Sequence, residues 1–384
     1  MKQKIIIVGG GICGLTTAIA IQEQFEVEIY EAAPEFKPVG AGLVLSANAL
    51  KAYQVIGIAD EIIQVGNVIN HFYIKNSSGK ILTEASIQKL GTGVGKVGTV
   101  SIHRADLHRI LLSQLNDNVK VFTNKRVQTV DKQLDNVTIY FQDKTSAIGD
   151  YVLACDGIYS AVRKSLVPNA EIRYSGYTCW RGILNHNLDN FDASIATETW
   201  GRDGRFGVVP LTNNRIYWFA CINSKTSKNR LFEAFRIEHL QENFRDYHFP
   251  IPQSLELTEQ SAVFWDDITD LKPLTKFAYD NILLMGDAGH ATTPNMGQGA
   301  CQAIEDAAVL GQVLKTETDV KTAFQTYEKR RIKRTTKIVN TSWTIGKMAQ
   351  MTNPIAVSLR NFATQMTPKS VGEKQTKFLL DVDF

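Results

Sequence analysis

Short apolar runs, separated by glycine-rich and polar stretches, give the first 31 residues a regular order. Ile5–Val8 and Val27–Tyr30 are short and apolar, which is typical of strands that are buried on both faces. Between them, Leu15–Gln24 has the apolar spacing of a helix, and the turn Gly9–Gly14 precedes it. This order predicts a βαβ unit at the start of the chain.

The pattern becomes richer in strands after this unit. Phe72–Lys75 and Ile81–Glu84 lie on either side of the turn residues Asn76–Gly79, which predicts a hairpin. Further elements are predicted as a helix at Asp106–Leu115 and as strands at Val119–Thr123, Val137–Phe141 and Tyr151–Ala154.

The segment from about Glu171 to Asp270 is mostly strand-like, with one helical stretch inside it at Ser227–Arg245. Its clearest predicted strands are Thr197–Trp200, Arg205–Val209 and Ile216–Ile222. A nucleotide-type segment then returns, with a strand at Ile282–Met285 and a helix at Ala300–Leu314, and the rest of the chain is mainly helical. We therefore expect a nucleotide-binding layer built from several pieces of the sequence, with a β-sheet domain inserted between them.

Composition excludes some classes of partner. The 384-residue chain has a formal net charge of only +3, and its basic residues cluster only at Lys329–Lys337, so nothing favours nucleic acid. The apolar run at Ile5–Val8 is too short for a signal peptide, and no run reaches the ~18 residues of a membrane span. We expect a cytoplasmic protein without integral membrane contact.

Single buried thiols and no metal are expected because no CxxC or zinc pattern occurs among Cys13, Cys155, Cys179, Cys221 and Cys301.

The strongest chemical signal is Gly9–Gly14 (GGGICG), which fits G-x-G-x-x-G between a strand and a helix. Gly9 permits the tight turn, Gly11 lets the backbone approach a pyrophosphate, and Gly14 lets the helix pack closely on the strand. Glu31 ends the second strand, where its carboxylate accepts hydrogen bonds from ribose hydroxyls and repels a 2′-phosphate. The motif predicts FAD or NAD rather than NADP, and alone it does not separate the first two.

A second glycine-rich segment follows a later strand. Gly286–His290 (GDAGH) is followed by Pro294 and by Gly297–Gly299 (GQG). Asp287 is suited to accept from a ribityl hydroxyl, and a helix start stabilises the anion of a reduced flavin. For His290 we favour a hydrogen-bonded structural role over proton transfer.

A third segment, Asp156–Arg163 (DGIYSAVR), follows the apolar strand Tyr151–Ala154. By itself it predicts a turn with an Asp-Gly step and an N-cap serine, Ser160, before a helix.

Taken in order, the three segments resemble the class A flavin-dependent monooxygenases, the family of para-hydroxybenzoate hydroxylase. The resemblance covers essentially the whole chain. It is strongest to the branch that contains FAD-dependent urate hydroxylase, salicylate hydroxylase-like enzymes and zeaxanthin epoxidase. The segments that indicate this branch are Val39–Leu43, Tyr174–Gly182 and Gly297–Ala307.

The resemblance implies a non-covalently bound FAD and a role for each matching residue. In the family, the residue that matches Arg104 reaches FAD from the start of a helix, and the one that matches Pro294 lies beside the isoalloxazine. The residues that match Asp156 and Arg163 bind FAD and contact NAD(P)H transiently. A surface arginine is the alternative for Arg104, although a helix N-terminus disfavours a positive charge. The expected cofactor-binding residues are Gly9, Gly11, Cys13, Gly14, Glu31, Gly42, Arg104, Asp156, Arg163, Asp287, Pro294, Gly297 and Gly299.

The resemblance also implies the fold. We expect an α/β protein with a Rossmann-like, glutathione reductase-like FAD-binding domain, an inserted and mostly antiparallel β-sheet domain that binds substrate, and a helical C-terminal segment. The FAD-binding domain would comprise residues 1–70, 101–170 and 280–330, the substrate domain residues 71–100 and 171–279, and the C-terminal segment residues 331–384.

The implied activity is that of an FAD-dependent monooxygenase. It would consume NADH or NADPH and insert one oxygen atom from O2 into a small aromatic, heteroaromatic or unsaturated substrate through a flavin C4a-hydroperoxide. No second G-x-G-x-x-G occurs, so NAD(P)H is expected to bind only transiently. The sequence does not separate hydroxylation from epoxidation, NADH from NADPH, or a monomer from a homodimer.

No catalytic side chain is expected with certainty, because the flavin carries the chemistry. Arg205 and Tyr217, on strands of the inserted sheet, match positions that face substrate in the urate hydroxylase branch; the alternative is ordinary strand residues. The period of two places Tyr217 and Phe219 on one face. If no acidic side chain pairs with Arg205, its charge calls for a planar substrate bearing a carbonyl, carboxylate or enolate.

Two departures from the branch and two rival functions remain. Lys37 stands where the branch often has arginine, and Gly289 replaces the second alanine of G-D-A-A-H. A flavin-dependent reductase or dehydrogenase on the same fold is one rival, while the W-x-W-x-I-P segment of flavin halogenases is absent. A non-catalytic binding protein of the GDP-dissociation-inhibitor type is the other, and the intact flavin motifs argue against it.

Overall fold

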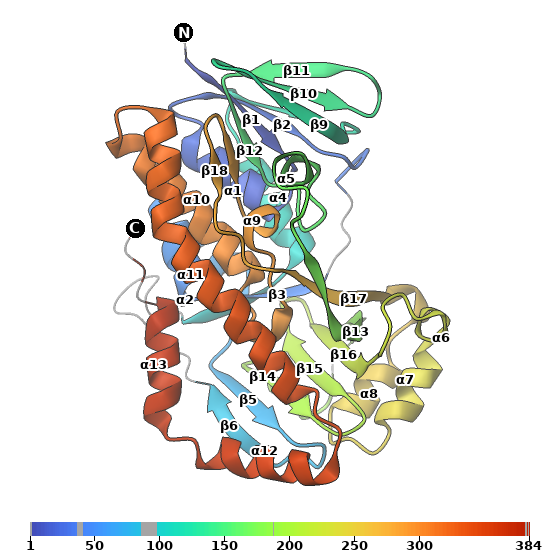
Figure 1. The fold of residues 1–384 in the computed structure, drawn as a ribbon. Coiled ribbons are helices and arrows are strands. Elements are labelled where there is room, and N and C mark those ends of the chain that lie inside the picture. Colours follow the sequence, from blue (N-terminus) through green and yellow to red (C-terminus); the bar gives the residue numbers. More distant parts are fainter. Residues whose placement is uncertain (1, 37–40, 86–97, 187, 381, 383) are drawn as a thin grey trace.

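Two large sheets, one above the other in Figure 1, organise the chain. The structure is a computed structural model that describes residues 2–36, 41–85, 98–186, 188–380, 382 and 384. Within these residues the upper sheet has six strands in the order β18-β19-β12-β1-β2-β8, and the lower sheet has seven in the order β17-β13-β16-β15-β14-β5-β6.

The upper sheet is mostly parallel and buried on both faces. Its centre is β1 (Lys4–Val8), where Ile5 and Ile7 face one hydrophobic cluster and Ile6 faces another. This explains the unbroken apolar run, because a strand covered on both sides needs no polar alternation. The other strands are β2 (Glu26–Tyr30), β8 (Val119–Phe122), β12 (Tyr151–Ala154), β18 (Ala278–Tyr279) and β19 (Ile282–Leu284).

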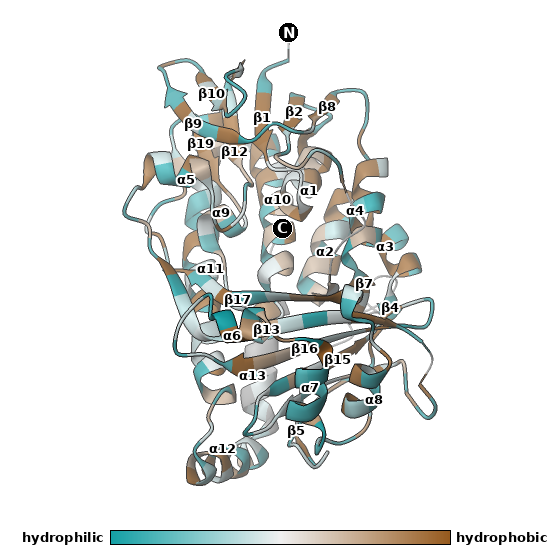
Figure 2. Cartoon of the chain, turned by 90° about the vertical axis from the view of Figure 1, so that its right-hand side faces the viewer, coloured by the Kyte–Doolittle hydropathy of each residue, from teal (hydrophilic) through white to brown (hydrophobic). Residues whose placement is uncertain are grey.

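Helices cover one face of this sheet and a small antiparallel sheet covers the other. The strands of the upper sheet are mostly hydrophobic in Figure 2, as this double cover requires. The helical side contains α1 (Ile12–Ile21), α2 (Ala47–Ile56), α3 (Ala59–Val65), α4 (Arg104–Ser113) and α10 (Gly299–Thr316). The opposite side contains β9 (Val127–Lys132), β10 (Val137–Phe141), β11 (Ser146–Gly149) and α5 (Ala161–Leu166).

The lower sheet joins a hairpin from early in the chain to later strands. β5 (His71–Lys75) and β6 (Ile81–Ala85) form the predicted hairpin, and β5 pairs in parallel with β14 (Ile195–Trp200). The remaining strands are β13 (Ile172–Asn185), β15 (Arg205–Pro210), β16 (Arg215–Asn223) and β17 (Val263–Leu271). A third, small sheet of β3 (Gly42–Ser46), β4 (Asn67–Val68) and β7 (Thr99–His103) also forms.

The expected helical stretch Ser227–Arg245 is wrong as a single element. It consists of α6 (Arg230–Glu233) and α7 (Ile237–Phe244), with a break between them. Phe232 and Phe235 both pack their rings on Trp180 of the sheet. The break lies at Arg236, whose extended backbone (φ −102°, ψ 173°) interrupts the helix and forms the N-cap of α7. α7 and α8 (Ile251–Glu256) cover the outer face of the lower sheet.

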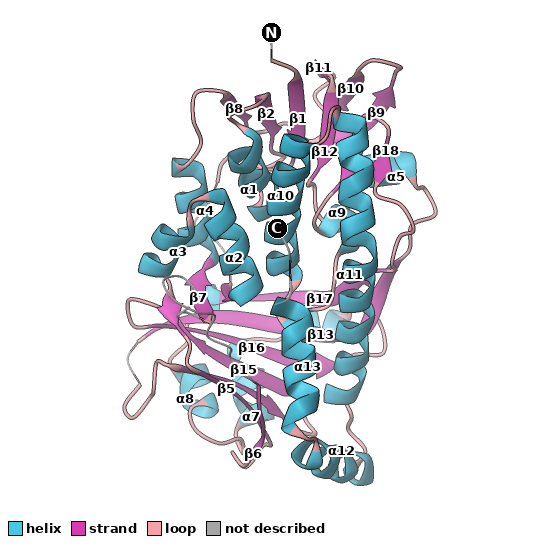
Figure 3. Cartoon of the chain, turned by 90° about the vertical axis from the view of Figure 1, so that its left-hand side faces the viewer, coloured by secondary structure: helices cyan, strands magenta, loops and turns pink. Residues whose placement is uncertain are grey.

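The long helix α11 (Val320–Ala349) runs past both sheets, as Figures 1 and 3 show. It leads into α12 (Pro354–Met366) and α13 (Lys369–Leu380). No helix in the described part of the chain is long and apolar enough to cross a membrane. The proposed domain limits stay a prediction; α11 continues through residue 331, and residues 86–97, like the Lys37 and Val39 positions, lie outside the described residues.

A buried ionic network joins α10 to α11. Arg331 is 1% exposed, and its guanidinium contacts the carboxylates of Glu305 and Asp306, which are fully buried. Arg334 donates to Glu305 as well and to the backbone oxygen of Leu379 at the end of α13. The network therefore connects the cofactor-side helices to the C-terminal segment.

We expect Arg331→Met to be strongly destabilising, because it leaves two buried carboxylates without their shared cation. The free energy of unfolding should fall by about 3–5 kcal/mol in chemical denaturation. Lys333→Met, an exposed position on the same helix, is the matched control and should stay within about 0.5 kcal/mol of the parent protein. Equal stability of the two variants would contradict the role given to the network.

Candidate functional site

The turn Gly9–Gly14 has two kinds of glycine. Gly9 has φ +102°, and a Cβ built on it would lie 2.5 Å from the carbonyl oxygen of Cys155. A Cβ on Gly14 would lie 2.0 Å from the carbonyl oxygen of Gly9. In contrast, a Cβ on Gly11 meets no atom within 4 Å. Gly9 and Gly14 are therefore required by packing, while Gly11 borders open space at the start of α1.

Glu31 is held beside this turn by backbone groups. Its Oε2 accepts from the N–H of Gly10 at 2.7 Å, and its Oε1 accepts from the N–H of Ala33 at 2.8 Å. The side chain is only partly buried. Each carboxylate oxygen keeps a further lone pair, as a contact with ribose hydroxyls requires.

The segment Asp156–Arg163 starts α5 as the sequence predicts. Ser160 is the N-cap, and its Oγ accepts from the N–H of Arg163 at 2.9 Å. Asp156 Oδ2 accepts from the N–H of Ala161 at 2.8 Å, so this carboxylate also serves the helix start.

Arg163 lies inside the protein at the junction of two segments. Its side chain is buried, and its guanidinium donates to the carbonyl oxygens of Ala288, at 3.0 Å, and of Ile158. These hydrogen bonds tie the Asp-Gly segment to the Gly-Asp segment. The expected contact with FAD or NAD(P)H stays a prediction.

Asp287 lies where the segments Gly9–Gly14, Asp156–Arg163 and Gly286–His290 meet. We call this meeting point the motif junction. It opens the short helix α9 (Asp287–His290) after Gly286, whose φ is +54° and whose Cβ would lie 2.9 Å from Cys13 Sγ. Asp287 is exposed to solvent, yet burial by the surrounding protein raises the pKa of its carboxyl, and the charges of His290 and Arg104 oppose that rise. The Asp287 carboxylate is thus accessible to solvent among closely packed neighbours, and the charge of Arg104 acts on it.

His290 has the expected structural role. Its Nε2 lies 2.7 Å from Oδ2 of Asp306, which also accepts from the N–H of Gly286 at 2.7 Å. Burial alone would raise the pKa of the Asp306 carboxyl, but His290, Arg331 and these hydrogen bonds lower it to about 2. An ionised Asp306 thus holds the backbone that presents Asp287.

The loop after His290 is anchored through Asn295, a residue that sequence reasoning missed. It lies in the 3-10 turn η3 (Pro294–Met296), and its Oδ1 accepts from Arg205 Nη1 at 2.7 Å and from the Tyr177 hydroxyl at 2.9 Å. Its Nδ2 donates to the backbone oxygen of Ser342 at 2.8 Å. Pro294 and Gly297 are exposed, Gly297 has φ +62°, and a Cβ there meets no atom within 4 Å.

Arg205 is not the unpaired cation that the sequence allowed. It is 1% exposed, its Nε lies 3.3 Å from Glu198 Oε1, and its Nη1 is bound to Asn295. We expected the substrate to pair with Arg205 only if no acidic side chain did so. Glu198 is such a side chain, so this expectation does not apply. Only the pairing of β14 with β15 brings Glu198 beside Arg205, so no local signal in the sequence would have found it.

Tyr217 connects the lower sheet to the cofactor side. A Cβ built on Gly42 of β3 would lie 2.6 Å from the Tyr217 side chain, so Gly42 is a glycine because this ring packs against it. Tyr217 and Phe219 lie on one face as predicted, with ring centroids 6.1 Å apart. This face of the lower sheet is therefore turned toward the FAD-binding motifs.

The five cysteines are free and buried, as expected, but four of them are neighbours in pairs. Cys179 lies opposite Cys221 on β13 and β16, and the neighbouring Cys155 thiol contributes most to the raised pKa of Cys13. The first contact follows from strand register and the second from the meeting of α1 with the end of β12, so neither could be recognised in the sequence.

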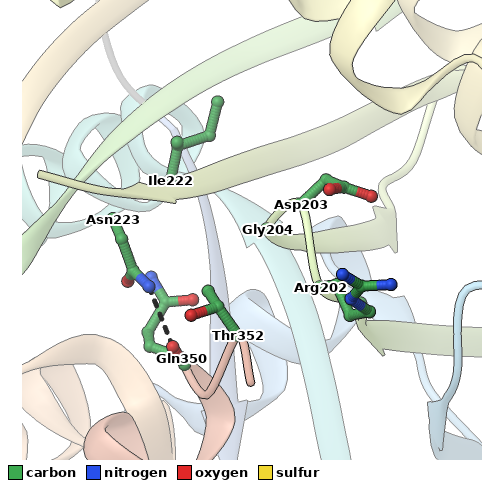
Figure 4. A pocket seen from close by; sticks show the side chains of 8 residues that line it. Arg202, Asp203, Gly204, Ile222, Asn223, Gln350 and Thr352 are labelled. Atoms are coloured by element: carbon green, nitrogen blue, oxygen red, sulfur yellow. Dashed lines mark hydrogen bonds between the residues drawn. The ribbon is translucent and has the colours of Figure 1, made fainter. Parts of the chain in front are cut away.

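A separate pocket lies at the turn between β14 and β15, near the end of α11. Figure 4 shows Arg202 and Asp203 on one side and Asn223 and Gln350 on the other, where Asn223 Nδ2 donates to the Gln350 carbonyl at 2.9 Å. None of the expected cofactor or substrate residues lines it. We therefore do not assign it to the candidate site, although it adjoins the strand that carries Arg205.

Comparison with known proteins identifies the family. Residues 2–342 match the FAD binding domain family. The chain is 34% identical to the aurachin C monooxygenase/isomerase of Stigmatella aurantiaca, over 97% of this chain and 96% of that protein. It is 29% identical to the 2-heptyl-3-hydroxy-4(1H)-quinolone synthase of Pseudomonas aeruginosa, over 95% and 94%. The crystal structure of Klebsiella pneumoniae HpxO complexed with FAD and uric acid superimposes with a TM-score of 0.86 at 25% identity, covering 98% and 97%.

The chain therefore belongs to the FAD binding domain family, within the class A flavin-dependent monooxygenases. It is an FAD-dependent monooxygenase with the expected Rossmann-like α/β fold, and use of NAD(P)H is typical of its family.

The motif junction fits FAD on its own geometry. A Cβ built on Gly11, Gly157 or Gly297 meets no atom within 4 Å, so each of the three turns leaves room beside its backbone. Asp287 and Arg104 are accessible beside them. A negatively charged pyrophosphate suits an arginine and a helix start, and ribityl hydroxyls suit a carboxylate.

We expect Gly11→Ala and Gly14→Ala to separate cofactor binding from packing. Gly11→Ala should leave thermal stability unchanged, because its φ of −78° suits alanine, while weakening FAD binding at least about 10-fold through the lost close approach. Gly14→Ala should lower stability by about 1–3 kcal/mol through its clash with Gly9. Fluorescence titration of the apoprotein and thermal denaturation measure the two effects. A Gly11→Ala protein that binds FAD normally would exclude the proposed approach.

We also expect Asp287→Ala to weaken FAD binding while the fold survives. Loss of one charge-assisted hydrogen bond corresponds to roughly 1.5–3 kcal/mol of binding free energy. Flavin titration measures the affinity, and circular dichroism checks the fold. Asp135→Ala, an exposed position between β9 and β10, is the control. Unchanged affinity and turnover in Asp287→Ala would remove the ribityl role.

Proposed function

We propose that this monooxygenase hydroxylates a planar nitrogen heterocycle that bears a ring carbonyl, with the 4-quinolones as the first class to test. The observation that carries the proposal is the sheet face around Tyr217 and Phe219, which is aromatic and largely apolar and is turned toward the motif junction. A flat ring packs well on such a face.

The names of the relatives support the same class. One relative is a 4(1H)-quinolone synthase whose product name carries a 3-hydroxyl group, and one similar structure holds uric acid. Quinolones and urate share a planar nitrogen-containing ring system with ring carbonyls. Because the similarity to both proteins extends over nearly the whole chain, it includes the lower sheet as well as the cofactor motifs.

We assign the cofactor roles as follows. Gly9, Gly11, Gly14 and the start of α1 hold the pyrophosphate, with Glu31 at the adenosine ribose. Arg104 and Asp287 hold the pyrophosphate and ribityl chain, and Pro294, Gly297 and Gly299 border the flavin ring. Cys13, Gly42, Asp156 and Arg163 support these contacts through packing and backbone hydrogen bonds. When bound, FAD supplies the redox chemistry, which amino-acid side chains do not provide.

The chain's own contribution is binding, orientation and exclusion of water. The Tyr217 face holds the ring of the substrate in place, and Gly42 lets that face approach the cofactor side closely. Water is kept away by the apolar residues Ile69, Val209 and Leu211 around Tyr217. NADH or NADPH binds transiently. We further propose that the protein acts in the cytoplasm, where its five thiols remain reduced, as a monomer or homodimer.

We expect 2-heptyl-4(1H)-quinolone or urate to stimulate NAD(P)H oxidation and O2 uptake by the purified protein, with salicylate and phenol much weaker. Mass spectrometry after turnover under 18O2 should find one labelled oxygen atom in the product. NADH and NADPH are tested in parallel. Stimulated NAD(P)H oxidation without incorporation of labelled oxygen would favour a reductase instead, and stimulation by salicylate alone would overturn the proposed substrate class.

A further inference from the structure

Arg181 is a second cation on the face that is turned toward the cofactor side. It lies on β13 between Cys179 and Ile183, on the face opposite to Trp180 and Leu184, which pack against α7 and α8. Across the sheet its neighbours are Phe219 and Phe264. An arginine in this setting needs an acceptor, because a charge among aromatic residues is costly without a partner.

The groups that stabilise the charge of Arg181 are mostly thiols and a phenol rather than carboxylates. The attraction of the Cys179 thiol contributes most to the raised pKa of its guanidinium, followed by Tyr217, Cys221 and Asp266, with burial opposing. Burial raises the pKa of the Tyr217 hydroxyl and the charge of Arg181 opposes that rise, so the two side chains are near neighbours. Among the described residues no carboxylate lies within 4.0 Å of it.

Arg181 is partly accessible to solvent, whereas Arg205 is not. Arg205 is 1% exposed and has Glu198 and Asn295 as partners, whereas Arg181 is only partly buried. A guanidinium carries five N–H donors, which suits it to bind a carbonyl or an anionic oxygen. The accessible donors of Arg181 and the Tyr217 ring lie together on the face assigned to substrate.

We propose that Arg181, with Tyr217 beside it, binds the carbonyl or anionic oxygen of the substrate, and that Arg205 instead positions the flavin loop through Asn295. The proposal rests on the proposed function, since it names the residue that recognises the acceptor of that substrate class. Arg181 is thus a specificity-determining residue. Arg205 is a positioning residue, because its guanidinium fixes the amide that anchors Pro294–Gly297.

The test compares ligands with and without the carbonyl or carboxylate oxygen, which is the acceptor meant here. Perturbation of the flavin absorbance, measured without NAD(P)H, gives the dissociation constants of 2-heptyl-4(1H)-quinolone and of 2-heptylquinoline, and likewise of salicylate and phenol. In the parent protein the member with the acceptor should bind more tightly in at least one pair. Arg181→Met should weaken that member about 10- to 100-fold and leave its acceptor-free partner unchanged. Arg181→Lys should be intermediate, because it keeps the charge without the planar fork.

Arg205→Lys is the informative contrast. It keeps a cation for Glu198 but shortens the reach to Asn295, so it should lower FAD affinity while preserving the preference for the acceptor. Arg230→Met, at an exposed position on α6, is the control and should change neither quantity.

The outcomes separate this inference from the proposed function. If the parent protein prefers neither acceptor-bearing ligand, the inference is overturned, whatever the turnover assays show. If the parent protein turns over a quinolone and Arg181→Met keeps the full preference, the function stands and the role of Arg181 is lost. Loss of the preference in Arg205→Lys but not in Arg181→Met would assign recognition to Arg205.

Discussion

The fully buried carboxylate of Asp306 is the constraint on which the rest of the site depends. A buried charge is stable only when its oxygens are hydrogen-bonded and a cation lies nearby. Asp306 meets this requirement with the Gly286 N–H, the His290 ring and the Arg331 guanidinium. The same contacts fix the turn that presents Asp287 and hold α10 against α11. The geometry of the cofactor turn is therefore supported from the protein interior.

A second constraint is the space left around glycines. Gly9 and Gly14 have no room for a side chain because the backbone itself fills that volume, while Gly11 and Gly297 border open space. At Gly42, the space that a side chain would need is occupied by the ring of Tyr217. One residue type thus serves chain packing, access for a cofactor and contact between the two sheets. Only the structure separates these reasons.

Local sequence signals predicted much of the fold. The strands Val137–Phe141 and Tyr151–Ala154, the hairpin at Asn76–Gly79 and the Ser160 N-cap were all recognisable, because each depends on a few neighbouring residues. The contact of Glu198 with Arg205, the contact of Gly42 with Tyr217 and the buried position of Arg163 were not. Each of these depends on the register between strands or on the meeting of distant segments, which no short pattern encodes.

The central claim is that three separated segments converge to hold one FAD without a covalent bond. The most direct test is the flavin content of the purified protein, read from its absorbance and from the flavin released by acid precipitation. The account predicts a yellow protein that releases close to one FAD per chain into the supernatant. A colourless protein that takes up no added FAD, or flavin that remains with the precipitate, would contradict it.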